Sequence, residues 1–162
     1  MTFYLKSGAL EIDIHKDIIL DNLLAWDVYF EFKTAEFDGT LFHSKIDEDE
    51  IEIVLINGTY LWISFGIQNE LLIKPNITLN DLNWHTLNLE WNLKELSVYL
   101  DKKAFIKPIK NRRLLRLAPK IYLGANLRSQ DGYLGCLRSL WIQGRKINLE
   151  EIFNTHSKGR EK

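Results

Sequence analysis

Two glutamates spaced for one strand face are the first candidates for catalysis. Glu50 and Glu52 lie two positions apart in a segment that alternates polar and apolar residues, so both side chains are expected on the same face of a strand. Retaining glycoside hydrolases need two carboxyl groups about 5 Å apart. The chain lacks an E-x-D-x-x-E-like strand motif, and Glu52 is more simply a solvent-facing strand residue. A sandwich-fold glycoside hydrolase is therefore the less favoured interpretation, and we predict that the chain is not an enzyme.

A basic segment is the second candidate, and it would bind rather than catalyse. On a chain with a net charge of −1, it creates a local positive field. The planar fork of arginine suits sulfate and carboxylate groups, so the segment could bind an anionic glycan of the glycosaminoglycan type or a protein partner. It could equally be an exposed rim, or a sheet edge kept soluble by lysines. Its members are Lys102, Lys103, Lys107, Lys110, Arg112, Arg113, Arg116 and Lys120.

Three further positions could carry a covalent modification. Two N-x-[ST] sequences begin at Asn57 and Asn76, and both fall in predicted turns, where a glycan could be accommodated. Cys136 is the only cysteine, which excludes a disulfide within the chain and a cysteine-cluster metal site. A lone cysteine usually packs as a small apolar residue, and the alternative is a bridge to a partner outside the chain.

Length and composition narrow the class of protein. The chain has 162 residues, of which 46% are hydrophobic and 27% charged, typical of one globular domain. It has no apolar run of membrane-spanning length. The near-neutral charge, and basic residues without interleaved aromatics, argue against nucleic acid as a partner. Its first residues do not form a signal peptide, so we expect either a cytosolic protein or a domain excised from a longer secreted chain.

The pattern that must position these residues is β-structure throughout. Apolar and polar residues alternate with period two, as in Val28, Phe30 and Phe32, and a helical period is nearly absent. Asn57-Gly58 is the strongest hairpin signal, and residues 102–103 and 143–144 are further expected tips. Residues 45–50 are expected to form an acidic loop, and residues 147–149 a short return strand. About a dozen short strands favour an all-β, two-sheet antiparallel jelly-roll sandwich over a small barrel.

Six stretches of the chain carry a recognisable order of motifs: FYLKSGALEIDI, VYFEFKT with DGTLFH, IEIVLINGTYLWISFG, LNDLNWHTLNLEWNLKELSVYLD, KIYLGA and GYLGCLRSLWIQGRKINLEE. Taken in order, they resemble the laminin G-like (LNS) domain of laminins, neurexins and contactin-associated proteins. This resemblance implies a concanavalin A-like sandwich formed by residues 1–153, with a polar tail at 154–162 expected to be frayed. It also implies a non-catalytic extracellular module that binds a protein or an anionic glycan through rim loops in cell adhesion or matrix contacts. The chain would then be part of an extracellular protein or of the ectodomain of a single-pass membrane protein, with no direct membrane insertion.

The same resemblance implies a calcium site, and it also shows where this chain departs from the expected ligands. Alignment on Asn57-Gly58 places Asp49 at the acidic ligand position and Gly66 near the carbonyl ligand position. Oxygen ligands of this kind suit Ca²⁺. Where the family carries a second side-chain ligand, the chain has Arg116, whose guanidinium would repel a cation. The alternative is that residues 45–50 are a solvated acidic loop without a metal.

Other family features apply in part. The cysteine that resembles Cys136 commonly pairs with a second cysteine near the domain end, and that partner would have to lie outside this chain. Trp84 and His85 would have structural roles at a strand start and a turn. The main alternative function is a carbohydrate-specific lectin of the same architecture, in which Tyr60 and Trp62 could stack on a sugar, although core packing is commoner for such residues. A lipophilic-ligand pocket between the sheets is a weaker possibility.

Overall fold

The regular structure is β-strand, as the alternation predicts. The computed structural model describes residues 3–5, 10–14, 23–110, 113–124 and 135–149. Within these residues it contains the strands β1 (Phe3–Leu5), β2 (Leu10–Asp13), β3 (Ala25–Lys33), β4 (Gly39–Ile46), β5 (Asp49–Ile56), β6 (Tyr60–Phe65), β7 (Glu70–Ile73), β8 (His85–Asn92), β9 (Glu95–Leu100), β10 (Lys103–Pro108), β11 (Lys120–Leu123), β12 (Gly135–Ile142) and β13 (Arg145–Lys146). The expected tail and the end of the expected domain, residues 150–162, lie outside the described residues.

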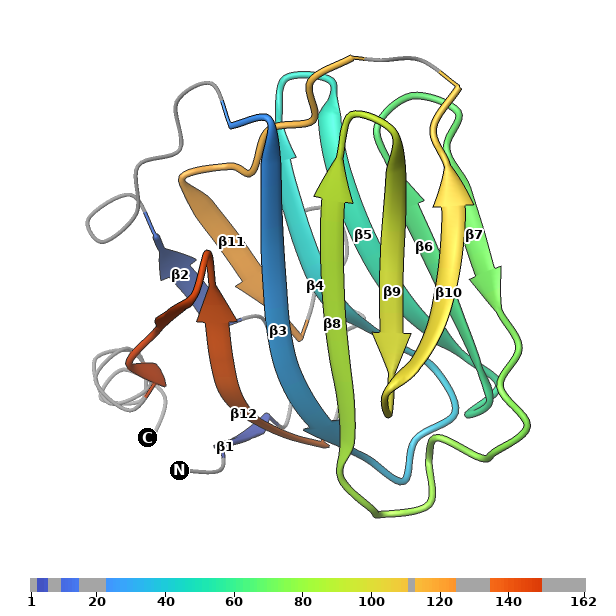
Figure 1. Ribbon diagram of the computed structural model, residues 1–162. Coiled ribbons are helices and arrows are strands. Elements are labelled where there is room, and N and C mark those ends of the chain that lie inside the picture. Colours follow the sequence, from blue (N-terminus) through green and yellow to red (C-terminus); the bar gives the residue numbers. More distant parts are fainter. Residues whose placement is uncertain (1–2, 6–9, 15–22, 111–112, 125–134, 150–162) are drawn as a thin grey trace.

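Two antiparallel sheets face one another (Figure 1). The first has the order β1-β12-β3-β8-β9-β10, with β13 paired to β12, and the second has the order β2-β11-β4-β5-β6-β7. All pairings are antiparallel, and neighbours such as β12 and β3 come from opposite ends of the chain. This arrangement confirms the two-sheet sandwich expected from the sequence.

The core forms because one face of each strand is apolar. In β3 and β8 every second residue is buried, and Phe30 of β3 lies opposite Leu87 of β8. From the other sheet, Phe42 stacks on Phe30 with ring centroids 6.3 Å apart. Burial of such side chains on both inner faces drives the sheets together.

Tight turns join the strands, with three differences from expectation. The turn at Asn57-Gly58 is confirmed, with φ of 53° and 68°. Residues 45–50 are not an open acidic loop: β4 and β5 extend to Ile46 and Asp49, and only two residues form the turn. The hairpin expected at residues 102–103 turns one residue earlier. The return strand after Gly144 is β13 (Arg145–Lys146), not residues 147–149, because β12 pairs with residues 145 and 146 directly after the turn.

The strand ends define two rims of the sandwich. The pocket rim comprises the β4–β5, β6–β7 and β8–β9 turns together with residues 109–110 and 113–119, and the opposite rim comprises the β3–β4, β5–β6, β7–β8 and β9–β10 connections (Figure 1). In the part of the chain that is described, no helix has the length and apolarity required to cross a membrane.

Candidate functional site

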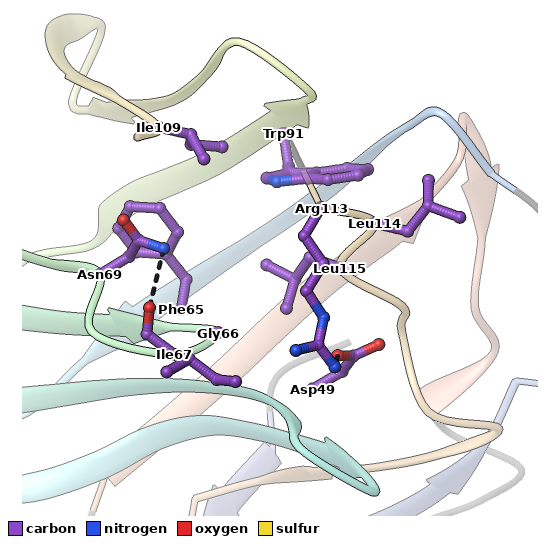
Figure 2. Close-up of a pocket in the computed structure, with 10 residues that line it drawn as sticks. All are labelled: Asp49, Phe65, Gly66, Ile67, Asn69, Trp91, Ile109, Arg113, Leu114 and Leu115. Atoms are coloured by element: carbon purple, nitrogen blue, oxygen red, sulfur yellow. Dashed lines mark hydrogen bonds and ion pairs between the residues drawn. The ribbon is translucent and has the colours of Figure 1, made fainter. Parts of the chain in front are cut away.

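A hollow opens at the pocket rim, between the ends of the two sheets. It encloses about 90 Å³, which is below the range of roughly 300–1,000 Å³ typical of small-molecule pockets. Figure 2 shows apolar side chains on its walls and Asp49 beside Arg113 at one side. The hollow suits an inserted side chain better than a lipophilic ligand. Its lining residues are Asp49, Phe65, Gly66, Ile67, Asn69, Trp91, Ile109, Arg113, Leu114 and Leu115.

The described residues 113–119 form a strap that crosses this rim and ends at β11. The indole nitrogen of Trp26 donates a hydrogen bond of 2.8 Å to the carbonyl of Leu115. The hydroxyl of Ser44 accepts one of 2.9 Å from the backbone of Ala118. Leu115 and Leu117 are buried. The strap is therefore a packed part of the sandwich.

A buried carboxylate ties the strap to the β4–β5 hairpin. Asp49 is only 4% exposed, and one of its oxygens accepts hydrogen bonds from both the Nε (2.7 Å) and the backbone N–H (3.1 Å) of Arg116. Arg113 lies 3.8 Å from the other oxygen. Hydrogen bonds with Asp49 and Asp47 raise the pKa of Arg116 above its ordinary value. Two cationic side chains thus surround the position where the resemblance implies a metal ligand.

The residues present do not fit a calcium ion in this arrangement. Calcium binds through six to eight oxygens. Here the Asp49 carboxylate is instead bonded to the guanidinium of Arg116. Gly66 lies on the same rim, and its N–H donates to the carbonyl of Glu50 at 2.8 Å. The expectation of a solvated acidic loop also needs correction for Asp49, which is buried because the strap covers it.

The expected basic segment is divided between different parts of the molecule. Strand β10 runs from one rim to the other, so Lys102 and Lys103 lie at the opposite rim, Lys107 on an edge strand and Lys110 at the pocket rim. Arg113 and Arg116 are paired with acids of the β4–β5 hairpin. Lys120 begins β11 in the second sheet, where it lies 3.4 Å from Glu11 of the neighbouring strand β2. Arg112 lies outside the described residues. The described cations therefore do not form one patch.

Both expected glycosylation sites are accessible, but the backbone at Asn57 is more constrained than the backbone at Asn76. Asn76 is exposed, as are the two residues that follow it. Asn57 is exposed in the three-residue turn between β5 and β6, where its backbone N–H donates a hydrogen bond of 3.1 Å to Asp38. Asn76 is therefore the less constrained acceptor.

Cys136 lies half-buried on the outer face of β12, opposite Tyr4 on one side and Lys33 on the other. No second cysteine exists in the chain. The disulfide to a residue outside the chain therefore stays a prediction.

His85 has the structural position expected for it. Its ring lies between two carboxylates of the opposite rim, with Nδ1 2.6 Å from Asp101 and Nε2 2.8 Å from Asp81. Burial alone would lower the pKa of His85, but the hydrogen bonds with Asp101 and Asp81 outweigh it and raise the pKa. The pKa of Asp81 falls to about 2, because hydrogen bonds from Asn83 and His85 outweigh burial, which acts to raise it.

The aromatic residues considered for a lectin lie on the outer face, not in the core. Tyr60 and Trp62 are half-buried, and the indole nitrogen of Trp62 donates a 2.8 Å hydrogen bond to Glu70. The ammonium of Lys74 lies 6.0 Å from the centroid of the Tyr60 ring. Outer-face residues of β6 are therefore only partly covered, contrary to the core role that is commoner for such residues.

Sequence reasoning missed the tryptophan pair that supports the strap. Trp26 and Trp91 stack with centroids 5.8 Å apart, and Trp26 bonds the strap while Trp91 lines the hollow. A signal was present, because Trp26 shares the alternation phase of Val28, Phe30 and Phe32. No sequence pattern predicts that the Trp26 indole bonds to the carbonyl of Leu115.

Comparison with known proteins agrees with this architecture. A Laminin G domain family model matches residues 32–145. Neurexin-4 of Drosophila melanogaster is 32% identical over 131 residues, covering 77% of this chain and 10% of that protein. The chain thus spans about a tenth of the length of this curated relative.

Two solved laminin structures share the fold. Domains LG4-5 of the mouse laminin alpha1 chain superpose with a TM-score of 0.71 at 19% identity, covering 91% of this chain and 42% of that one. The LG1-3 region of the laminin alpha2 chain gives 0.68 at 16% identity, with 91% and 26% covered. The family match over most of the chain, together with this sandwich, shows that the chain belongs to the laminin G domain family.

Proposed function

We propose that this domain is a non-catalytic extracellular binding module that engages a protein ligand through the pocket rim. The observation that carries the proposal is the family membership, combined with exposed apolar side chains beside charged ones at this rim. Ile67 and Leu114 are 44% and 36% exposed beside the hollow. Asp49 and Arg113 line the same hollow, and Glu48 and Asp47 of the hairpin pair with Arg113 and Arg116 of the strap. An apolar centre with a charged border is the usual anatomy of a protein interface.

An anionic glycan is the less favoured ligand for this rim. Its arginines already face Asp47, Glu48 and Asp49, so a sulfate group would have to compete with three carboxylates. Contact with a protein surface of mixed charge requires no such exchange. We propose further that binding does not depend on calcium, because Arg116 occupies the carboxylate that would hold the ion.

Binding of tetramerised domain to intact cultured animal cells tests the proposal. We expect saturable binding that survives heparinase and chelator and is removed by mild surface proteolysis. A double variant, Ile67→Asp with Leu114→Asp, should lose most of it, because both changes place charge at the apolar centre of the rim.

The matched control is Leu82→Asp with Phe37→Asp. These side chains are 63% and 65% exposed at the opposite rim, so the change in charge is the same and only the location differs. Equal loss in both double variants, or no saturable binding to any cell type, would contradict the proposal. Binding abolished by heparinase would favour the glycan instead.

A further inference from the structure

The outer face of the second sheet carries a polar ladder that the proposed function does not use. Paired residues on adjacent strands project to the same face, and one such row crosses all six strands of this sheet. Three of its members are glutamates, and the row contains no lysine or arginine. From edge to edge it reads Glu11, Tyr122, His43, Glu52, Ser64 and Glu70.

Three metal-ligating side chains converge at the centre of this ladder. His43 on β4 is fully buried, and its Nε2 lies 2.7 Å from Glu50 and 3.8 Å from Glu52. The two glutamates occupy alternate positions of β5 and so lie on one face. One ligand atom from each residue can be chosen so that all lie within 4.8 Å of one another. Their backbones are fixed by the central strand pair of the sheet.

We propose that His43, Glu50 and Glu52 bind a divalent transition cation of the zinc class. An imidazole nitrogen with two carboxylates suits Zn²⁺, whereas Ca²⁺ and Mg²⁺ prefer oxygen ligands alone. Zinc bonds of about 2.1 Å in tetrahedral geometry place ligand atoms about 3.4 Å apart. Since the three ligand atoms already lie within 4.8 Å of one another, we expect adjustment of the glutamate side chains to reach this spacing, with water as the remaining ligand.

The site is accessible, and its two carboxylates favour a cation, with Lys45 opposite Glu50 as the positive charge that a bound ion would face in the strand register. The Glu50 and Glu52 side chains are 25% and 16% exposed, so an ion can enter from solvent while the imidazole stays covered. The carboxylates repel one another at this range, and a doubly charged ion offsets both. A histidine that serves only as an ion-pair partner for the glutamates would give the same contacts but would not retain a metal.

Metal titration separates these two roles. Chelator-treated protein carrying Cys136→Ser, which removes the thiol as a ligand, is titrated with Zn²⁺ by calorimetry and with Co²⁺ by visible absorption. We expect one tight site per chain and a zinc-dependent rise in Tm. The isosteric variants Glu50→Gln and Glu52→Gln should each weaken the affinity by at least about tenfold.

Glu70→Gln is the matched control, because Glu70 lies in the same ladder but bonds Trp62 instead of the cluster. Its zinc affinity should stay within about twofold of the parent value. The proposal is overturned if no site is detected, if Glu52→Gln leaves the affinity unchanged, or if the control loses as much as the cluster variants. Circular dichroism of each variant confirms folding, and none of these outcomes depends on binding at the pocket rim.

Discussion

Asp49 forms an ion pair in place of the metal contact that the family resemblance led us to expect. Its carboxylate is held in a buried position by the hairpin and covered by the strap. A buried carboxylate needs a compensating charge or several hydrogen bonds. Here Arg116 supplies both, so the position that could hold a metal stabilises the contact between strap and hairpin instead.

Calcium is therefore expected to leave the thermal stability of the chain unchanged. Tm should be the same in millimolar Ca²⁺ and in excess chelator, because no bound ion distinguishes the native state. Asp49→Asn should lower the free energy of unfolding by about 1–2 kcal/mol, since charge-assisted bonds become neutral ones. Differential scanning calorimetry measures both effects.

Arg116→Asn provides the converse test. It removes the guanidinium and adds an oxygen ligand, so a calcium-dependent rise in Tm is expected only in this variant. A calcium-induced rise in the parent chain, lost in Asp49→Asn, would show that the guanidinium does not exclude the ion.

The Asp81–His85–Asp101 group predicts a pH-dependent stability. The folded pKa of His85 is raised above 6.5, so its contribution is full below that pH and is lost as pH rises through the folded value. The pKa of Asp81 is lowered from 3.8 to about 2, so its contribution is present above pH 3.8 and is lost as pH falls towards 2. Both act together between about pH 4 and 6.5.

Asp81→Asn should therefore cost more stability at about pH 5.5 than at about pH 8.5, by about 1 kcal/mol after allowance for solvent screening. Urea unfolding at the two pH values measures the difference. Asp38→Asn, at the same rim, is the control because Asp38 bonds the backbone of Asn57 and not a histidine. A loss for Asp81→Asn that is equal at both pH values would contradict the assigned coupling.

At the level of elements, the opposite rim is joined through the β5–β6 turn. Gly58 donates to the carbonyl of Phe37 and accepts from the backbone of Leu79 and Asn80. It thereby connects the β3–β4 and β7–β8 segments to this hairpin. Its φ is +68°, and a Cβ at this position would overlap the side chain of Asn80.

Gly58→Ala is expected to reduce the free energy of unfolding by at least about 2 kcal/mol. A positive φ costs an alanine about 1 kcal/mol, and the displaced Asn80 adds to it. Gly144→Ala is the matched control: its φ is +72°, and nothing lies within 4 Å of an added Cβ, so it should lose only about 1 kcal/mol. Equal losses in chemical denaturation would show that Asn80 moves aside freely.

For the whole molecule, the distribution of charge decides the affinity for polyanions. The described cations of residues 102–120 lie on different rims and strands, and several face acids. Elution from immobilised heparin is therefore expected at or below a physiological ionic strength of about 0.15 M. Retention well above this value, weakened by Lys110→Glu but not by Lys103→Glu, would indicate a local glycan site at the pocket rim.

The sequence alone determined most of the strands, the inner and outer faces of those strands, and the family. Period-two alternation places Leu87 and Leu89 on the inner face of β8 whatever the sheet order, and Asn57-Gly58 marks a turn through local backbone preference. Such features depend on near neighbours in the chain and on burial, so they can be read without a fold.

Only the tertiary structure decided which charges meet. Arg116 and Asp49 are 67 residues apart in sequence, and Trp26 and Leu115 are 89 apart. Their contacts depend on a strap packed across the ends of two sheets. The basic segment, continuous in sequence, is divided for the same reason: β10 carries its residues from one rim to the other. Electrostatic sites depend on distances through space, and these are set when the two apolar faces pack together.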